Sequence, residues 1–84
     1  MPEEVIGKVS DFFARLVVAG IELTATLKLG DKIHIKGHTT DMEFIVDSIQ
    51  INNVDVEKAK AGDAVGVKVT ERVRSGDTVY KVID

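Results

Sequence analysis

Short runs in which apolar and polar residues alternate fill most of the chain, and glycine-containing turns separate them. The clearest run covers residues 29–37, where Ile33 and Ile35 are predicted to point inward. The outward positions of the same run are basic: Lys32, His34 and Lys36. A period of two over this length predicts β-strands.

The same alternation predicts several other strands. They are expected at residues 5–10, 15–23, 43–51, 54–56, 65–71 and 78–83. In the first of them, Val5 and Val9 are predicted to share one face, with Gly7 at a barrel corner or a bulge. The run 43–51 changes phase, which predicts a bulge near Asp47 and Ser48.

Gly-Asp pairs recur three times between these runs. They are Gly30-Asp31, Gly62-Asp63 and Gly76-Asp77. Glycine supplies a positive φ, and the aspartate can hydrogen-bond to nearby backbone, so each pair predicts a tight turn. Short strands joined by such turns predict an all-β fold built as an antiparallel Greek-key barrel. The predicted core contains Ile33, Ile35, Val46, Ile49, Val65, Val67 and Val69.

Length and composition restrict the function classes. The chain has 84 residues, which predicts a single domain over 1–84. It has no cysteine, so disulfides, thiol catalysis and cysteine-ligated metals are excluded, and a cytoplasmic location is expected. The net charge of −3 excludes a strongly basic nucleic-acid protein, although local basic patches remain possible. No apolar run is long enough for a membrane helix, so no membrane partner is expected.

An ordered set of short motifs resembles the second domain of translation GTPases, the superfamily of elongation factor Tu. The matching stretches are residues 6–9, 29–33, 46–49, 61–67 and 74–77. The chain is most similar to small, stand-alone translation elongation factor-like proteins. The resemblance implies a closed six- or seven-stranded barrel of the translation-protein type. A similar barrel is appended to the collagenase-like peptidases, where stretches resembling 21–23, 35–37 and 79–82 also recur.

The resemblance does not extend to an active site. No Gly-x-x-x-x-Gly-Lys-Ser/Thr phosphate loop is present, so GTP binding is not expected. No nucleophile elbow is present either, so the chain is expected not to be an enzyme. The first functional hypothesis is a binding module that contacts RNA, the ribosome or a translation factor. The alternative is an accessory, protein-interaction subunit that acts in trans with a collagenase-like peptidase.

Basic side chains on predicted outer faces are the candidate contact residues for RNA or a partner. The set comprises Lys32, His34, Lys36, Arg72 and Arg74, with Phe12 as a stacking or partner contact. The alternative is that these charges only solvate a strand face. His34, His38 and Asp41 come nearest to a metal cluster, but no second ligand pair is visible, so neither a metal nor a cofactor is expected.

Overall fold

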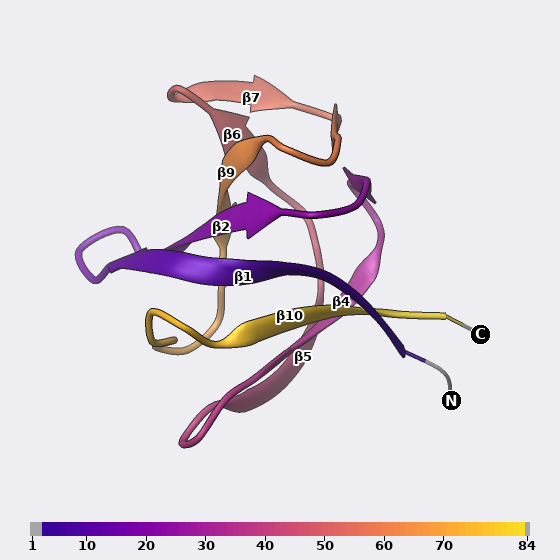
Figure 1. Ribbon diagram of the computed structural model, residues 1–84. Coiled ribbons are helices and arrows are strands. Elements are labelled where there is room, and N and C mark those ends of the chain that lie inside the picture. Colours follow the sequence, from indigo (N-terminus) through magenta and orange to yellow (C-terminus); the bar gives the residue numbers. More distant parts are fainter. Residues whose placement is uncertain (1–2, 84) are drawn as a thin grey trace.

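The computed structural model describes residues 3–83, which form ten β-strands joined by turns (Figure 1). The strands are β1 (Glu3–Phe13), β2 (Val18–Leu23), β3 (Leu27–Lys28), β4 (Lys32–Lys36), β5 (Asp41–Ile45), β6 (Ile49–Ile51), β7 (Val54–Val56), β8 (Lys58–Ala59), β9 (Ala64–Lys68) and β10 (Thr78–Val82). No helix occurs in the described range, so the all-β prediction is confirmed. Accordingly, nothing between residues 3 and 83 has the helical length and apolarity needed to span a membrane.

Eight of the strands form one curled antiparallel sheet. Its order is β5-β4-β10-β1-β2-β9-β6-β7, and β3 pairs with β8 in a separate two-stranded ladder. The closed barrel predicted from the sequence is wrong, because the end strands β5 and β7 do not pair with each other.

The gap between the two ends of the sheet is bridged by a turn. Val46, just after β5, exchanges backbone hydrogen bonds with Gly30 and Asp31, at 2.8 and 2.9 Å. Leu29 donates to the carbonyl of Glu57, just after β7, at 2.9 Å. The turn before β4 therefore occupies the place where a strand-to-strand ladder would close a barrel.

A β-bulge in β1 corrects the predicted face of its first residues. The register of β1 against β10 shifts between Val5 and Gly7, so Ile6 is buried and Val5 is 50% exposed. The prediction that Val5 shares the inward face of Val9 is therefore wrong. The predicted bulge at Gly7 is confirmed by this register shift. Only glycine fits there, because a Cβ would lie 2.5 Å from the carbonyl oxygen of Glu22.

One hydrophobic core lies inside the curled sheet, and all seven core residues named from the sequence belong to it. The phase change in 43–51 has a different origin from the predicted bulge. The chain leaves the sheet after Ile45 and re-enters it at Ile49 in β6, the strand next to the other end of the order. Val46 and Ile49 are both buried, so the break still places an apolar side chain on each side of it in the core.

The three Gly-Asp turns have the same structure. Gly30, Gly62 and Gly76 have φ values of 90°, 94° and 98°. In each turn the aspartate carboxylate accepts the backbone N–H of the residue three positions earlier, at 2.9–3.0 Å. The donors are Lys28, Lys60 and Arg74. The turns predicted from these pairs are confirmed.

Val67→Asp is expected to unfold the chain. Val67 is 0% exposed, and an unpaired carboxylate buried there costs several kcal/mol against a total of about 5–15 kcal/mol for a small domain. The matched control is Val54→Asp, the same substitution at a side chain that is 62% exposed on the end strand β7. Thermal unfolding followed by circular dichroism measures both; equal losses would contradict the inward assignment of Val67.

Gly7→Ala and Gly20→Ala are expected to differ although both glycines lie in long strands. The added methyl at Gly7 meets the Glu22 backbone, which cannot rotate away, and should cost about 1–3 kcal/mol. At Gly20 the nearest atom would be 3.5 Å away, an ordinary contact, so the change should stay within about 1 kcal/mol. Urea denaturation at equilibrium tests the difference, and a Gly7→Ala chain as stable as the original would contradict it.

Candidate functional site

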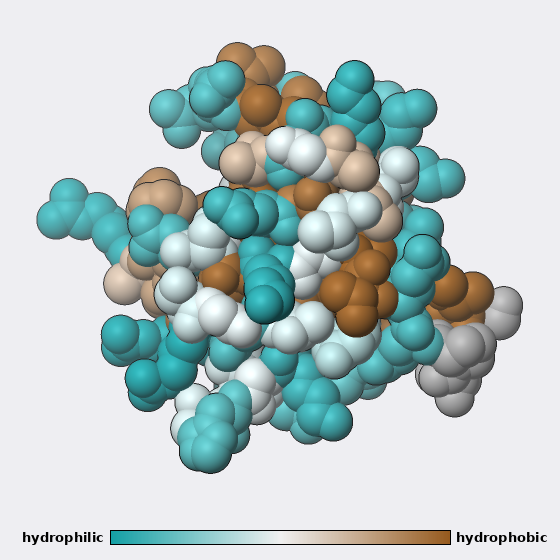
Figure 2. All heavy atoms as spheres, in the orientation of Figure 1, coloured by the Kyte–Doolittle hydropathy of each residue, from teal (hydrophilic) through white to brown (hydrophobic). Residues whose placement is uncertain are grey.

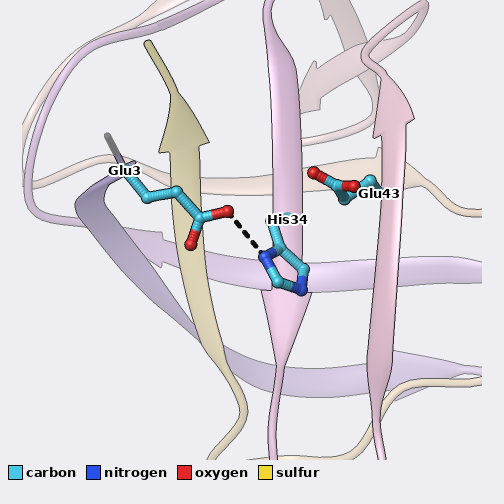
Figure 3. A group of neighbouring side chains, drawn as sticks. All are labelled: Glu3, His34 and Glu43. Atoms are coloured by element: carbon cyan, nitrogen blue, oxygen red, sulfur yellow. Dashed lines mark hydrogen bonds and ion pairs between the residues drawn. The ribbon is translucent and has the colours of Figure 1, made fainter. Parts of the chain in front are cut away.

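Ionisable side chains from three strands gather around His34 on the outer face of the sheet (Figure 3). His34 lies in the middle of β4, opposite Glu43 of β5 and Tyr80 of β10. Glu3, at the start of β1, approaches from the far side of β10 and points toward the imidazole. Asp41, at the start of β5, contacts the ring as well.

Both imidazole nitrogens are held by carboxylates. Nδ1 of His34 lies 2.7 Å from Oε2 of Glu3, and Nε2 lies 2.5 Å from Oδ1 of Asp41. Glu43 completes the group: one ligand atom each from Glu3, His34 and Glu43 lie within 4.8 Å of one another. The carboxylate of Glu43 forms no hydrogen bond or ion pair with any residue of the described range, and it stands beside the ring in Figure 3.

The surroundings of His34 act on its pKa in opposite directions. Burial of the ring, whose side chain is 14% exposed, lowers the pKa. The hydrogen bonds to Asp41 and Glu3, together with the negative charge of both carboxylates, raise it. The net result is a pKa raised above 6.5, so the ring is charged over a wider pH range than a free histidine.

The six candidate contact residues divide between two places. Lys32, His34 and Lys36 point outward from β4 as predicted, and both lysines are exposed. The face is not basic overall, however, because Glu43 and Asp41 lie directly opposite His34 and Lys36 on β5. The basic side chains of β4 therefore do not form a continuous positive surface, because acidic side chains of β5 lie beside them.

The other three candidates lie together at the opposite end of β1. Phe12, Arg72 and Arg74 line a shallow hollow of about 450 Å³. The two arginines are in the connection between β9 and β10 and not at the end of a strand, and they flank the buried Val73.

Of the two neighbouring phenylalanines, the exposed one is Phe13 and not Phe12, the residue expected to contact RNA or a partner. Phe12 is half-buried against the core, and Phe13 is 48% exposed. Phe13 and Leu16 border a hollow of about 390 Å³ whose floor includes the paired glycines Gly20 and Gly66. Figure 2 shows apolar surface between the β1–β2 hairpin and the β6–β7 hairpin above it.

Sequence reasoning missed Glu3 and Glu43. Glu43 could have been found, because it lies between the inward Met42 and Phe44 and therefore on the outer face of a strand beside β4. Glu3 could not, because counting back in steps of two from Val9 places it inside, and only the bulge at Gly7 turns it outward.

Comparison with known proteins points to peptidases. No protein-family model matches the chain. An uncharacterized protease of Methanocaldococcus jannaschii is 53% identical over 76 residues, which are 89% of this chain and 19% of that protein. A collagenase of Porphyromonas gingivalis is 37% identical over 78 residues, 90% of this chain and 22% of that protein. The chain thus spans about one fifth of the length of these relatives.

Solved structures with a similar fold also come from a peptidase. The C-terminal domain of a Geobacillus thermoleovorans protein assigned to the U32 peptidases superposes with a TM-score of 0.88 at 16% identity, over 95% of this chain and 93% of that domain. A selenomethionine variant of the same domain gives a TM-score of 0.86 at 15% identity, over 90% and 96%.

These relatives overturn the resemblance to translation factors. The chain is similar to segments of a protease and of collagenases, and its fold is that of a peptidase C-terminal domain. The assignment to translation elongation factor-like proteins is therefore wrong, and with it the expectation of a role in protein biosynthesis or RNA binding. The motifs that carried it describe turns and strand starts, which report the fold and not the function.

The stability of the chain is expected to fall as pH rises through the raised pKa of His34. The folded state binds this proton more tightly than the unfolded state, so the stabilisation is fully present below about pH 6.5 and is lost above the folded pKa. The protonated ring donates one N–H to Glu3 and the other to Asp41. The other ionisable groups that face the ring or neighbour it on the same surface are Glu43, Tyr80, Lys32 and Lys36.

Urea midpoints measured from pH 5 to pH 9 test this dependence. His34→Gln should flatten the fall above pH 6.5, and His38→Gln, which removes the exposed histidine, should preserve it. A fall that persists unchanged in His34→Gln would assign the dependence to another group.

Proposed function

We propose that this chain is a non-catalytic accessory module of a collagenase-like peptidase, and that it acts by contacting protein and not nucleic acid. The observation that carries the proposal is the 53% identity to a protease over nearly the whole chain, combined with coverage of only 19% of that protease. Most of the relative, and thus most of the space for a catalytic centre, lies outside the shared segment. The fold supports the same division, because its likeness is to a C-terminal domain.

The chemistry of the described residues agrees with an accessory role. The sequence has no cysteine, so a thiol nucleophile is excluded. The half-buried His34 has both nitrogens engaged by carboxylates, so neither nitrogen is placed to take a proton from a hydroxyl nucleophile. No hydroxyl of a serine or threonine between residues 3 and 83 forms a hydrogen bond with either histidine.

The proposal is tested by replacing the matching segment of the Porphyromonas gingivalis collagenase. Three proteins are compared on gelatin: the intact collagenase, a form lacking the segment, and a form carrying this 84-residue chain in its place. The deletion should raise KM or lower kcat, and the graft should restore at least part of the loss. The isolated chain should leave gelatin intact. A Val67→Asp graft, which removes the fold and keeps the length, is the matched control and should restore nothing.

Two results would contradict the proposal. One is a deletion form that cleaves gelatin as well as the intact collagenase does. The other is cleavage of gelatin by the isolated 84-residue chain. The in trans form of the proposal is tested by adding the free chain to the deletion form and measuring the recovered rate; a saturable recovery supports action as a separate subunit.

A further inference from the structure

We propose that Glu3, His34 and Glu43 form a binding site for a divalent first-row transition-metal ion, with Zn²⁺ as the reference ion. The inference rests on the side-chain arrangement alone and is independent of the proposed function. One donor atom from each of the three residues lies within 4.8 Å of the other two. Two ligands that lie 2.0–2.2 Å from one zinc ion are at most about 4.4 Å apart, so a small side-chain rotation brings the three donors onto one ion.

The three donors come from three different strands. His34 is on β4 and Glu43 directly opposite it on β5, so the sheet ladder fixes their relative positions. Glu3 comes from β1 and reaches the ring across β10 (Figure 3). Because each donor stands on an ordered strand, an ion would find the three ligands already assembled on one face.

Asp41 completes a metal-site arrangement around the imidazole. It contacts Nε2, the nitrogen on the opposite side of the ring from Glu3. When Nε2–H donates to Asp41, the lone pair of Nδ1 points toward the side where Glu3 lies. A histidine whose second nitrogen is held by a carboxylate is the usual form of a metal-binding histidine, because that contact fixes its tautomer and orientation.

The local charge favours a cation at this position. Glu3, Asp41 and Glu43 place three negative charges around one ring that carries at most one positive charge. Among residues 3–83, neither Lys32 nor Lys36 forms an ion pair with any of these carboxylates. A divalent ion that takes the place of the imidazole proton reduces the excess by one charge and, lying between Glu3 and Glu43, relieves their repulsion.

The donor set restricts the kind of ion. One imidazole and two carboxylates combine a borderline nitrogen ligand with hard oxygen ligands, and the imidazole favours zinc and neighbouring first-row ions over magnesium or calcium. Three protein ligands leave at least one position open to water or to a group from another molecule.

Isothermal titration of the 84-residue chain with ZnCl₂ is the direct test. We expect one saturable site per chain and a thermal midpoint raised by about 10–20 °C when free Zn²⁺ is 100 times Kd. Glu43→Gln should lose the site with little effect on the fold, since Glu43 is exposed and has no other partner in the described range. Asp41→Ala should weaken binding about 10–100-fold through the freed imidazole.

Two matched controls separate this site from surface binding. Glu57→Gln removes an exposed carboxylate elsewhere, and His38→Gln removes the other histidine; both should leave Kd unchanged. Chemical shifts of the imidazole nitrogens should move on Zn²⁺ addition for His34 and not for His38.

Three outcomes would overturn the proposal: no saturable binding, full binding in Glu43→Gln, or loss of binding in His38→Gln. The first would leave the cluster as an ionic clamp on a protonated histidine. MgCl₂ in place of ZnCl₂ should produce no saturable heat, and equal binding of the two ions would contradict the assigned ion class.

Discussion

The bulge between Val5 and Gly7 in β1 determines both the core and the outer face of this sheet. Val9 points inward, and strict alternation back from it would bury Val5 and Glu3 as well. The extra residue places Ile6 in the core instead and turns Val5 and Glu3 to the outside. The bulge needs a glycine because the Glu22 carbonyl lies where a side chain would begin. A single irregularity thus seals the core at the strand that joins the two halves of the sheet, and it carries a carboxylate to His34.

Alternation predicted the strands whose two ends are determined locally. The run 29–37 starts at a Gly-Asp turn, and its inward isoleucines and outward basic residues were all placed correctly. The prediction of one bulged strand over residues 43–51 was wrong, because the alternation changes phase in the same way whether a strand bulges or ends. What ends β5 is the pairing of Val46 with the distant turn at Gly30 and Asp31, which no local pattern contains. The prediction of a closed barrel was wrong for the same reason, because closure also depends on contacts between residues far apart in the sequence.

The sequence identified the basic residues of the candidate site and Asp41, but not the carboxylates of Glu3 and Glu43. Residues of one strand can be assigned to a face by counting, which found Lys32, His34 and Lys36. The charge that a side chain experiences depends on cross-strand neighbours, and these place Glu43 and Asp41 opposite the basic positions. The predicted functional class, a translation factor-like module, was wrong for a related reason. Gly-Asp turns and valine-rich strands specify how a small β-sheet folds, and more than one family uses them, so they could not separate a translation factor from a peptidase accessory domain.

The pairing of β1 with β10 also decides how this chain would respond to tension. Glu3 is the cross-strand partner of Val82, so the first and last described strands begin and end side by side (Figure 1). A pull on the two ends loads this antiparallel ladder one hydrogen bond at a time, as in opening a zipper, and does not shear many bonds at once. The Glu3–His34 contact lies at the first rung that such a force meets. Because that contact ties the first rung to β4, it adds to the resistance that the sheet offers before it begins to peel open.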